Sequence, residues 1–81
     1  MDKNDLMVFA ENLKRLRMEK GITLRELAEA TGIGKSTLHE YENALTDPSL
    51  THVKLIAQYY DESIDWLAGE THVRRVKKIA E

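Results

Sequence analysis

The stretch from Gly32 to Asn43, GIGKSTLHEYEN, decides the fold of this chain. Gly32 can adopt a left-handed backbone conformation without a Cβ penalty, and Gly34 is an acceptable N-cap, so the stretch begins as a tight turn. A helical pattern follows, with Leu38 and Tyr41 three residues apart on one apolar face. We therefore predict a turn that leads into a short helix with a polar, outward face. That face consists of Lys35, Ser36, His39 and Glu40.

A second short amphipathic helix is predicted just upstream, at Leu24–Thr31 (LRELAEAT). Thr23 and Glu26 have the spacing of a capping box, in which the hydroxyl and the carboxylate each satisfy a free backbone amide. A helix, a glycine turn and a second helix with a polar face form the layout of a helix-turn-helix. The same pattern also fits an ordinary helical hairpin in a small bundle, because periodicity says nothing about a ligand.

The composition indicates one compact all-α domain. The chain has 81 residues with no cysteine and one proline, and 42% of the residues are hydrophobic, which favours a helical domain without disulfides or thiolate metal sites. No apolar run approaches the roughly 20 residues that cross a bilayer. The N-terminal MDKNDLMVF also lacks the apolar core of a secretion signal. We expect a cytoplasmic protein that does not bind membranes.

The sequence contains no recognisable catalytic or metal-binding pattern. His39, His52 and His72 lack the spacing of a metal site, and we interpret them as surface groups. Ser36 lies near His39, but no third residue orients the pair and no oxyanion pocket is evident. We therefore predict no enzyme activity, no cofactor and no metal.

The charge distribution limits how the chain could bind nucleic acid. A net charge of −2 argues mildly against such binding, because nucleic-acid binders usually present a basic face. The distribution matters more than the sum, and a positive field would have to come from a few residues, with the C-terminal segment as an addition. These residues are Lys14, Arg15, Arg17, Lys20, Arg25 and Lys35.

The N-terminal part of the chain predicts a first helix that Asn4 or Asp5 caps and that runs to about Lys20. Gly21 follows the last turn, as is usual at a helix C-terminus. The residues of its buried stripe are Leu6, Phe9, Leu13 and Leu16.

Two further helices are predicted after the loop that contains Pro48. Ser49 can cap a helix at Leu50–Tyr60, and Ser63 can cap a short fifth helix that ends at Gly69. The predicted inner residues are Leu50, Val53, Ile56, Ala57 and Tyr60 in the former, and Ile64 and Leu67 in the latter. We place the domain at 1–69 and a basic amphipathic segment at 70–81.

Several apolar residues lie off these buried stripes. Exposed apolar side chains that cluster beside an amphipathic segment often mark an interface. We therefore favour a homodimer interface that includes the C-terminal segment, where Ile79 and Ala80 continue the helical spacing. The alternative is that this segment folds back on its own domain. The predicted interface residues are Leu55, Tyr59, Trp66, Val73 and Val76.

The stretch from Asn12 to Leu67 resembles the lambda-repressor-like, Cro/cI-type helix-turn-helix family of regulators. The resemblance is carried by NLKRLRMEKGIT, LRELAEATGIGKSTLHEYEN, the Pro48-Ser49-Leu50 start and SIDWLAGE. It implies a five-helix domain that binds double-stranded DNA, usually as a homodimer on a pseudo-palindromic operator. It also implies an ion pair between Arg17 and Glu42.

The resemblance further implies roles for individual residues. Base contacts fall on Lys35, Ser36 and Glu40, with His39 close by. Two departures from the family pattern remove phosphate contacts: Leu24 stands in place of a glutamine, and the loop Ala44–Asp47 lacks the usual glycine and bases. The phosphate contacts that we assign are Lys14, Arg17, Arg25, Thr37 and Asn43.

These observations together predict a sequence-specific DNA-binding transcriptional regulator, and a repressor in particular, that acts as a dimer. The alternative function is a protein-interaction module on the same fold, such as an antitoxin-like partner, which the acidic balance of the chain favours.

Overall fold

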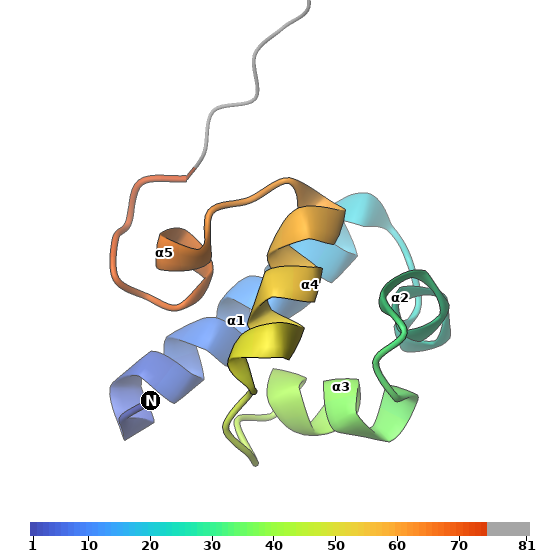
Figure 1. Cartoon of the computed structure of the whole chain (residues 1–81), viewed down its shortest axis with the longest axis horizontal. Helices are drawn as coiled ribbons and strands as arrows, with labels where there is room; N and C mark the ends of the chain where they lie inside the picture. The colour runs from blue at the N-terminus through green and yellow to red at the C-terminus, as the bar shows by residue number, and fades with distance from the viewer. Residues whose placement is uncertain (75–81) are drawn as a thin grey trace, which may run out of the picture.

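The computed structural model describes residues 1–74, which form five helices and no strand. In chain order these are α1 (Lys3–Lys20), α2 (Leu24–Thr31), α3 (Lys35–Glu42), α4 (Leu50–Tyr60) and α5 (Ile64–Leu67). Figure 1 shows α4 crossing in front of α1, with α2 and α3 toward one end of the molecule and α5 toward the other. The predicted all-α, five-helix fold is confirmed.

Side-chain caps fix where four of these helices begin. The predicted capping box is confirmed: Thr23 Oγ1 accepts from Glu26 N at 3.1 Å, and Glu26 Oε1 accepts from Thr23 N at 2.9 Å. Ser49 and Ser63 cap α4 and α5 as predicted. The prediction for α1 is wrong.

The cap of α1 is Asp2 instead of Asn4 or Asp5. Its carboxylate accepts a hydrogen bond from Asp5 N at 2.8 Å. Asp2 and Asp5 have the three-residue spacing that lets a capping oxygen reach a free amide of the first turn. The helix therefore begins at Lys3, earlier than predicted.

The C-caps of α1, α2 and α4 have a left-handed backbone, and the cap of α4 is Asp61 with φ +53°. Gly21 ends α1 with φ +71°, and Gly32 ends α2 with φ +77°, as predicted. After α3 the left-handed position is held by Ala44, with φ +55°. Its methyl group makes this conformation costlier than it would be for glycine.

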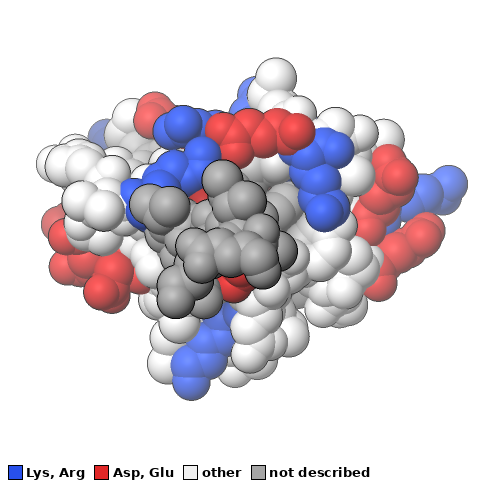
Figure 2. Space-filling view, turned by 90° about the horizontal axis from the view of Figure 1, so that it is seen from above, with Lys and Arg blue, Asp and Glu red and all other residues white. Residues whose placement is uncertain are grey.

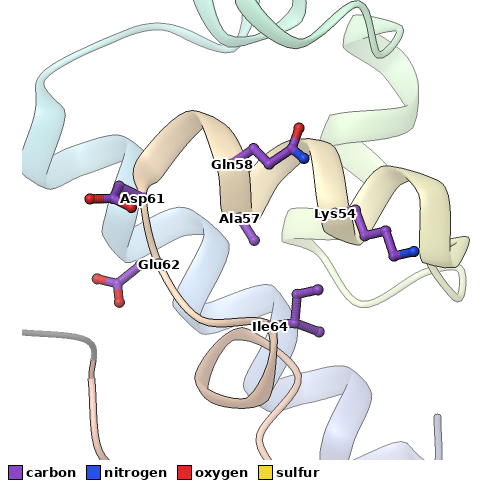
Figure 3. Close-up of a pocket in the computed structure, with 6 residues that line it drawn as sticks. All are labelled: Lys54, Ala57, Gln58, Asp61, Glu62 and Ile64. Carbon is purple, nitrogen blue, oxygen red and sulfur yellow. The ribbon is translucent and has the colours of Figure 1, made fainter.

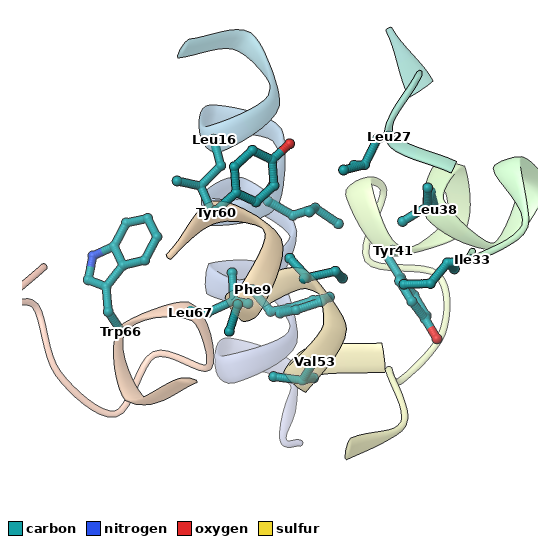
Figure 4. Packing of buried hydrophobic residues seen from close by; sticks show 13 residues of the cluster. Phe9, Leu16, Leu27, Ile33, Leu38, Tyr41, Val53, Tyr60, Trp66 and Leu67 are labelled. Atoms are coloured by element: carbon teal, nitrogen blue, oxygen red, sulfur yellow. The ribbon is translucent and has the colours of Figure 1, made fainter. Parts of the chain in front are cut away.

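One apolar core joins all five helices (Figure 4). It extends from Trp66 and Leu67 at the α5 end, past Phe9 of α1, to Leu27 and Leu38 at the α2–α3 end. The remaining members of the core are Leu13, Leu16, Ile33, Tyr41, Val53, Ile56, Ala57 and Tyr60.

Three residues of the predicted buried stripes lie further out than expected. Leu50 is 63% exposed and Ile64 is 37% exposed, while Leu6 is partly buried. Leu50 and Ile64 are each the first residue of a helix, directly after the cap, and the buried positions come later in each helix. Helical spacing predicts which residues share a face, but not where along its length a helix meets the core.

The prediction that Trp66 is exposed is also wrong, since Trp66 is only 4% exposed. Asn12 of α1 donates a hydrogen bond from Nδ2 to the Trp66 carbonyl oxygen at 2.9 Å, which ties α5 to α1. Tyr59 is partly buried, whereas Leu55 is 36% and Val73 is 73% exposed. Val76, Ile79 and Ala80 lie outside the described residues.

The C-terminal segment folds back on its own domain as far as it is described. Arg74 bonds to Glu19 of α1 and to Glu62 between α4 and α5. For residues 70–74 the structure therefore agrees with the alternative that we considered less favoured. Within residues 1–74, no helix has the length and apolar character needed to span a bilayer.

Candidate nucleic-acid interface

The turn between α2 and α3 presents α3 with an open N-terminus. Ile33 is 2% exposed and anchors the turn in the core. Gly34 caps α3 without a side-chain hydrogen bond, so the amides of the first turn have no side-chain partner from the cap. A Cβ added at Gly34 would meet only Thr37 Oγ1, at 3.6 Å, which is an ordinary contact distance. Free amides at a helix start attract anionic groups such as phosphate.

The two faces of α3 differ as the sequence predicts. Leu38 and Tyr41 are buried, at 0% and 3% exposure, and hold the helix against the core. Thr37 is partly buried. The four residues predicted to contact bases are all exposed on the other side, namely Lys35, Ser36, His39 and Glu40.

The last turn of α3 is closed by Asn43. Its Nδ2 donates to the His39 carbonyl oxygen at 2.8 Å and lies 3.5 Å from Nδ1 of the His39 ring. The amide nitrogen can only donate, so Nδ1 is the acceptor in this contact. Sequence reasoning assigned Asn43 to phosphate and missed this contact with His39.

The predicted ion pair between Arg17 and Glu42 is confirmed. Arg17 donates from Nε and Nη2 to the two carboxylate oxygens of Glu42, at 2.7 and 3.0 Å, and from Nη1 to the Ile22 carbonyl oxygen at 3.0 Å. The side chains are 19% and 5% exposed. The hydrogen bond to Glu42 is the main reason that the pKa of Arg17 is raised.

Three of the residues assigned to phosphate contacts lie on α1 and α2, and they differ in how free their side chains are. All three guanidinium nitrogens of Arg17 donate within the protein, so the structure gives Arg17 an internal role. Lys14 is exposed on α1, one turn before Arg17, and Arg25 is exposed in the first turn of α2.

A partly buried polar contact joins α3 to α4. Tyr41 Oη lies 2.7 Å from Nδ1 of His52, and the Tyr41 ring packs edge-on against Phe9 with centroids 5.8 Å apart. The sequence prediction that His52 is a surface group is wrong, because His52 is partly buried and bonded to Tyr41. Tyr41 is eleven positions away and on another helix, so the sequence alone does not indicate this contact. The contact holds α3 in place from behind its exposed face.

Charge is mixed on the side of the molecule away from α3. Figure 2 looks down on the molecule of Figure 1 from above, where α3 lies at the bottom. Among the described residues, basic and acidic side chains are interspersed on the visible face.

The fold and this exposed helix define a helix-turn-helix protein. The helix-turn-helix family model matches residues 13–67, and the chain belongs to this family, of the Cro/cI type. The sequence prediction of the family is confirmed.

Two curated relatives and one solved structure illustrate the similarity. The chain is 36% identical over 66 residues to the HTH-type transcriptional regulator SinR of Bacillus subtilis (strain 168), covering 80% of this chain and 60% of SinR. It is 28% identical over 72 residues to the cryptic phage CTXphi transcriptional repressor RstR of Vibrio cholerae, covering 89% of this chain and 65% of RstR.

The solved structure is the restriction-modification controller protein C.AhdI from Aeromonas hydrophila. It matches with a TM-score of 0.73 and 28% identity, over 79% of this chain and 97% of that chain. The chain thus spans nearly all of C.AhdI but less than two thirds of SinR or RstR. The shared region includes the helix-turn-helix, where the candidate interface lies.

Proposed function

We propose that this protein binds double-stranded DNA in a sequence-specific manner and regulates transcription, as a repressor, in the cytoplasm. The observation that carries the proposal is the exposed face of α3 beside an open helix N-terminus, within a helix-turn-helix. In this motif the second helix lies in the major groove and its N-terminal residues contact base edges. Lys35 and Ser36 occupy that first turn.

The chemistry of the exposed face supports base readout. Lys35 can donate to guanine O6 and N7, and Glu40 can accept from the cytosine amine. Glu40 also repels phosphate, so it disfavours sequences in which it has no amine to bind. With a net charge of −2, the protein gains little from non-specific attraction, and its affinity depends on contacts to the right bases.

We further propose that the protein acts as a homodimer on a pseudo-palindromic operator. Two half-sites one turn of DNA apart match a protein with two-fold symmetry. A groove of about 600 Å³ lies between α4 and α5, and Figure 3 shows Lys54, Gln58 and Ile64 at its edges. Leu55 of α4 is 36% exposed and lies outside the lining of this groove. We propose that a second copy packs against α4, over both the groove and Leu55.

A titration of binding against salt tests DNA binding. Selection from a random duplex library first gives the preferred site, and affinity for this site and for random duplex is then measured over a range of salt concentrations. We expect tight binding to the selected site and a fall of log K with log [salt], which reports neutralised phosphates. Failure to enrich any sequence, with no binding to random duplex even at low salt, would favour the protein-interaction module instead.

Sedimentation with a surface variant tests the homodimer. Truncation after Gly69 also removes Arg74, so a substitution is the cleaner change. We expect Leu55→Glu to shift the protein from dimer to monomer and to weaken operator binding, with Met18→Glu, at an exposed site on α1, as the matched control. A wild-type protein that remains monomeric at high concentration would rule the interface out.

A further inference from the structure

The side chain of Arg74 occupies a site built by three different parts of the domain. Its Nε and Nη2 donate to Glu62 Oε2 at 3.0 and 2.7 Å, and its Nη1 donates to Glu19 Oε2 at 3.1 Å. The guanidinium carbon lies 4.7 Å from the centroid of the Trp66 ring. The cation is thus bonded at its edge and stacked on its face.

The chemistry of this site fits a guanidinium better than an ammonium. A planar guanidinium can direct several N–H donors at carboxylates within its plane and stack on an aromatic ring at the same time. An ammonium is a compact, strongly hydrated charge that cannot form this arrangement. Glu62 is only 5% exposed, so its carboxylate is desolvated and its hydrogen bonds to a cation are strengthened.

Two of the three residues that form the site lie on helices of the domain, and Glu19 also accepts a hydrogen bond from Arg15 at 3.0 Å. Glu19 lies in the last turns of α1, and Trp66 lies on α5, whose backbone is tied to Asn12 of α1. Arg74 itself follows α5 in a segment without helix. The site is therefore part of the folded domain, whereas its occupant arrives on a non-helical extension.

A groove adjoins the site on the side of Glu19. It has a volume of about 240 Å³, adjoins the Arg74 side chain and is lined by Leu16, Tyr59 and Tyr60, among others. Lys20 covers the Tyr59 ring, with Nζ 5.1 Å from its centroid. The Arg74 side chain is 31% exposed, so solvent reaches the occupied site.

We propose that Glu19, Glu62 and Trp66 form a guanidinium-binding site, which Arg74 fills in cis and which accepts an arginine side chain from another polypeptide when Arg74 leaves. Residues 70–74 then form an exchangeable latch that blocks the site until an arginine in trans displaces it. This proposal does not depend on DNA binding, because every residue that it uses lies outside α2 and α3.

The single tryptophan of the chain, Trp66, reports on the site directly. Ethylguanidinium is titrated into Arg74→Ala at constant ionic strength and below denaturing concentrations, and Trp66 fluorescence is recorded with circular dichroism as a check on folding. We expect a saturable change in Arg74→Ala, and roughly tenfold weaker binding of ethylammonium. The wild type, with its site filled, should respond only at much higher concentration.

Two controls decide whether the response comes from this site. Adding Glu62→Gln to Arg74→Ala should abolish the saturable change, and a peptide of residues 70–74 should bind to Arg74→Ala in trans while the same peptide with Arg74→Lys should not. If Arg74→Ala does not fold, Arg74→Lys provides a background that keeps a cation in place. Equal responses to ethylguanidinium in the wild type and the variants, or equal binding of ethylammonium, would overturn the proposal.

Discussion

Arg17 and Glu42 join the last turn of α1 to the last residue of α3 through two hydrogen bonds between charged groups. The Glu42 side chain is 5% exposed, so its carboxylate depends on this partner far more than a surface carboxylate would. The pair therefore fixes the far end of the exposed helix against the longest helix of the domain.

A double-mutant cycle tests the energetic role of this pair. We expect Arg17→Met and Glu42→Leu each to lower the free energy of unfolding by about 3 kcal/mol, because each leaves one charge buried without its partner. The double variant should lose less than the sum of the two, since it removes both charges. Denaturant melts of the four proteins provide the values, and strictly additive losses would show that the residues act independently.

Base readout by Lys35 can be separated from phosphate contact by binding-site selection. Lys35→Ala should lower affinity for the best site by about 1–3 kcal/mol and relax preference at one base pair per half-site. Lys14→Ala should instead weaken binding to all sequences alike, because phosphate contacts carry no sequence information. If Lys35→Ala selects the same motif as the wild type, Lys35 contacts phosphate and does not read a base.

Glu40, the exposed acid of α3, should weaken non-specific binding to DNA, whereas Lys35 strengthens binding. Glu40→Gln removes a charge that repels phosphate, so we expect stronger binding to random duplex. It also replaces a carboxylate that can accept from a cytosine amine, so discrimination between sites should fall. Competition between selected and random duplex measures both effects, and Glu29→Gln, at an exposed position of α2, provides a matched loss of charge.

The backbone strain at Ala44 predicts a stabilising substitution. Ala44 has φ +55° where α3 ends, and Leu45 N donates to the Glu40 carbonyl oxygen at 3.0 Å across this turn. Ala44→Gly should raise the free energy of unfolding by about 1 kcal/mol, because glycine adopts this conformation without strain. Ala30→Gly within α2 should have the opposite sign. Thermal melts of both variants give the comparison.

The acid titration of Glu19 should report on the latch. Hydrogen bonds from Arg74, first, and from Arg15, second, hold the pKa of Glu19 below its usual value. Because the folded pKa is depressed, the stabilisation is fully present above the usual pKa of a glutamate and is lost as pH falls through the folded value. Arg74→Ala should raise the pKa of Glu19 more than Arg15→Ala does, as measured by carboxyl NMR.

The outcome at each residue shows which interactions a sequence can predict. Thr23, Ser49 and Ser63 were predicted as caps because a cap and the amide that it binds lie within three residues of each other. The same local reasoning failed at α1, where three candidate caps stand within four positions and only the structure distinguishes them. The inner and outer faces of α3 follow from its spacing alone.

The misassigned residues depend on contacts between distant parts of the chain. Trp66 looked exposed, but Asn12, 54 positions away, bonds to its carbonyl oxygen, and Arg74 stacks on its ring from beyond α5. His52 was likewise assigned to the surface without knowledge of Tyr41. Periodicity carries no information on such pairings, and the resemblance to a family located only the Arg17–Glu42 pair.

The division of α3 into two faces has a consequence for how such a protein diverges. Leu38 and Tyr41 hold the helix to the core, while the side chains of Lys35, Ser36, His39 and Glu40 are exposed. Substitutions at these four positions cost little folding free energy, since surface changes of this kind usually stay within about 0.5 kcal/mol. The exposed residues of α3 can therefore be substituted one at a time during evolution while every intermediate sequence still folds.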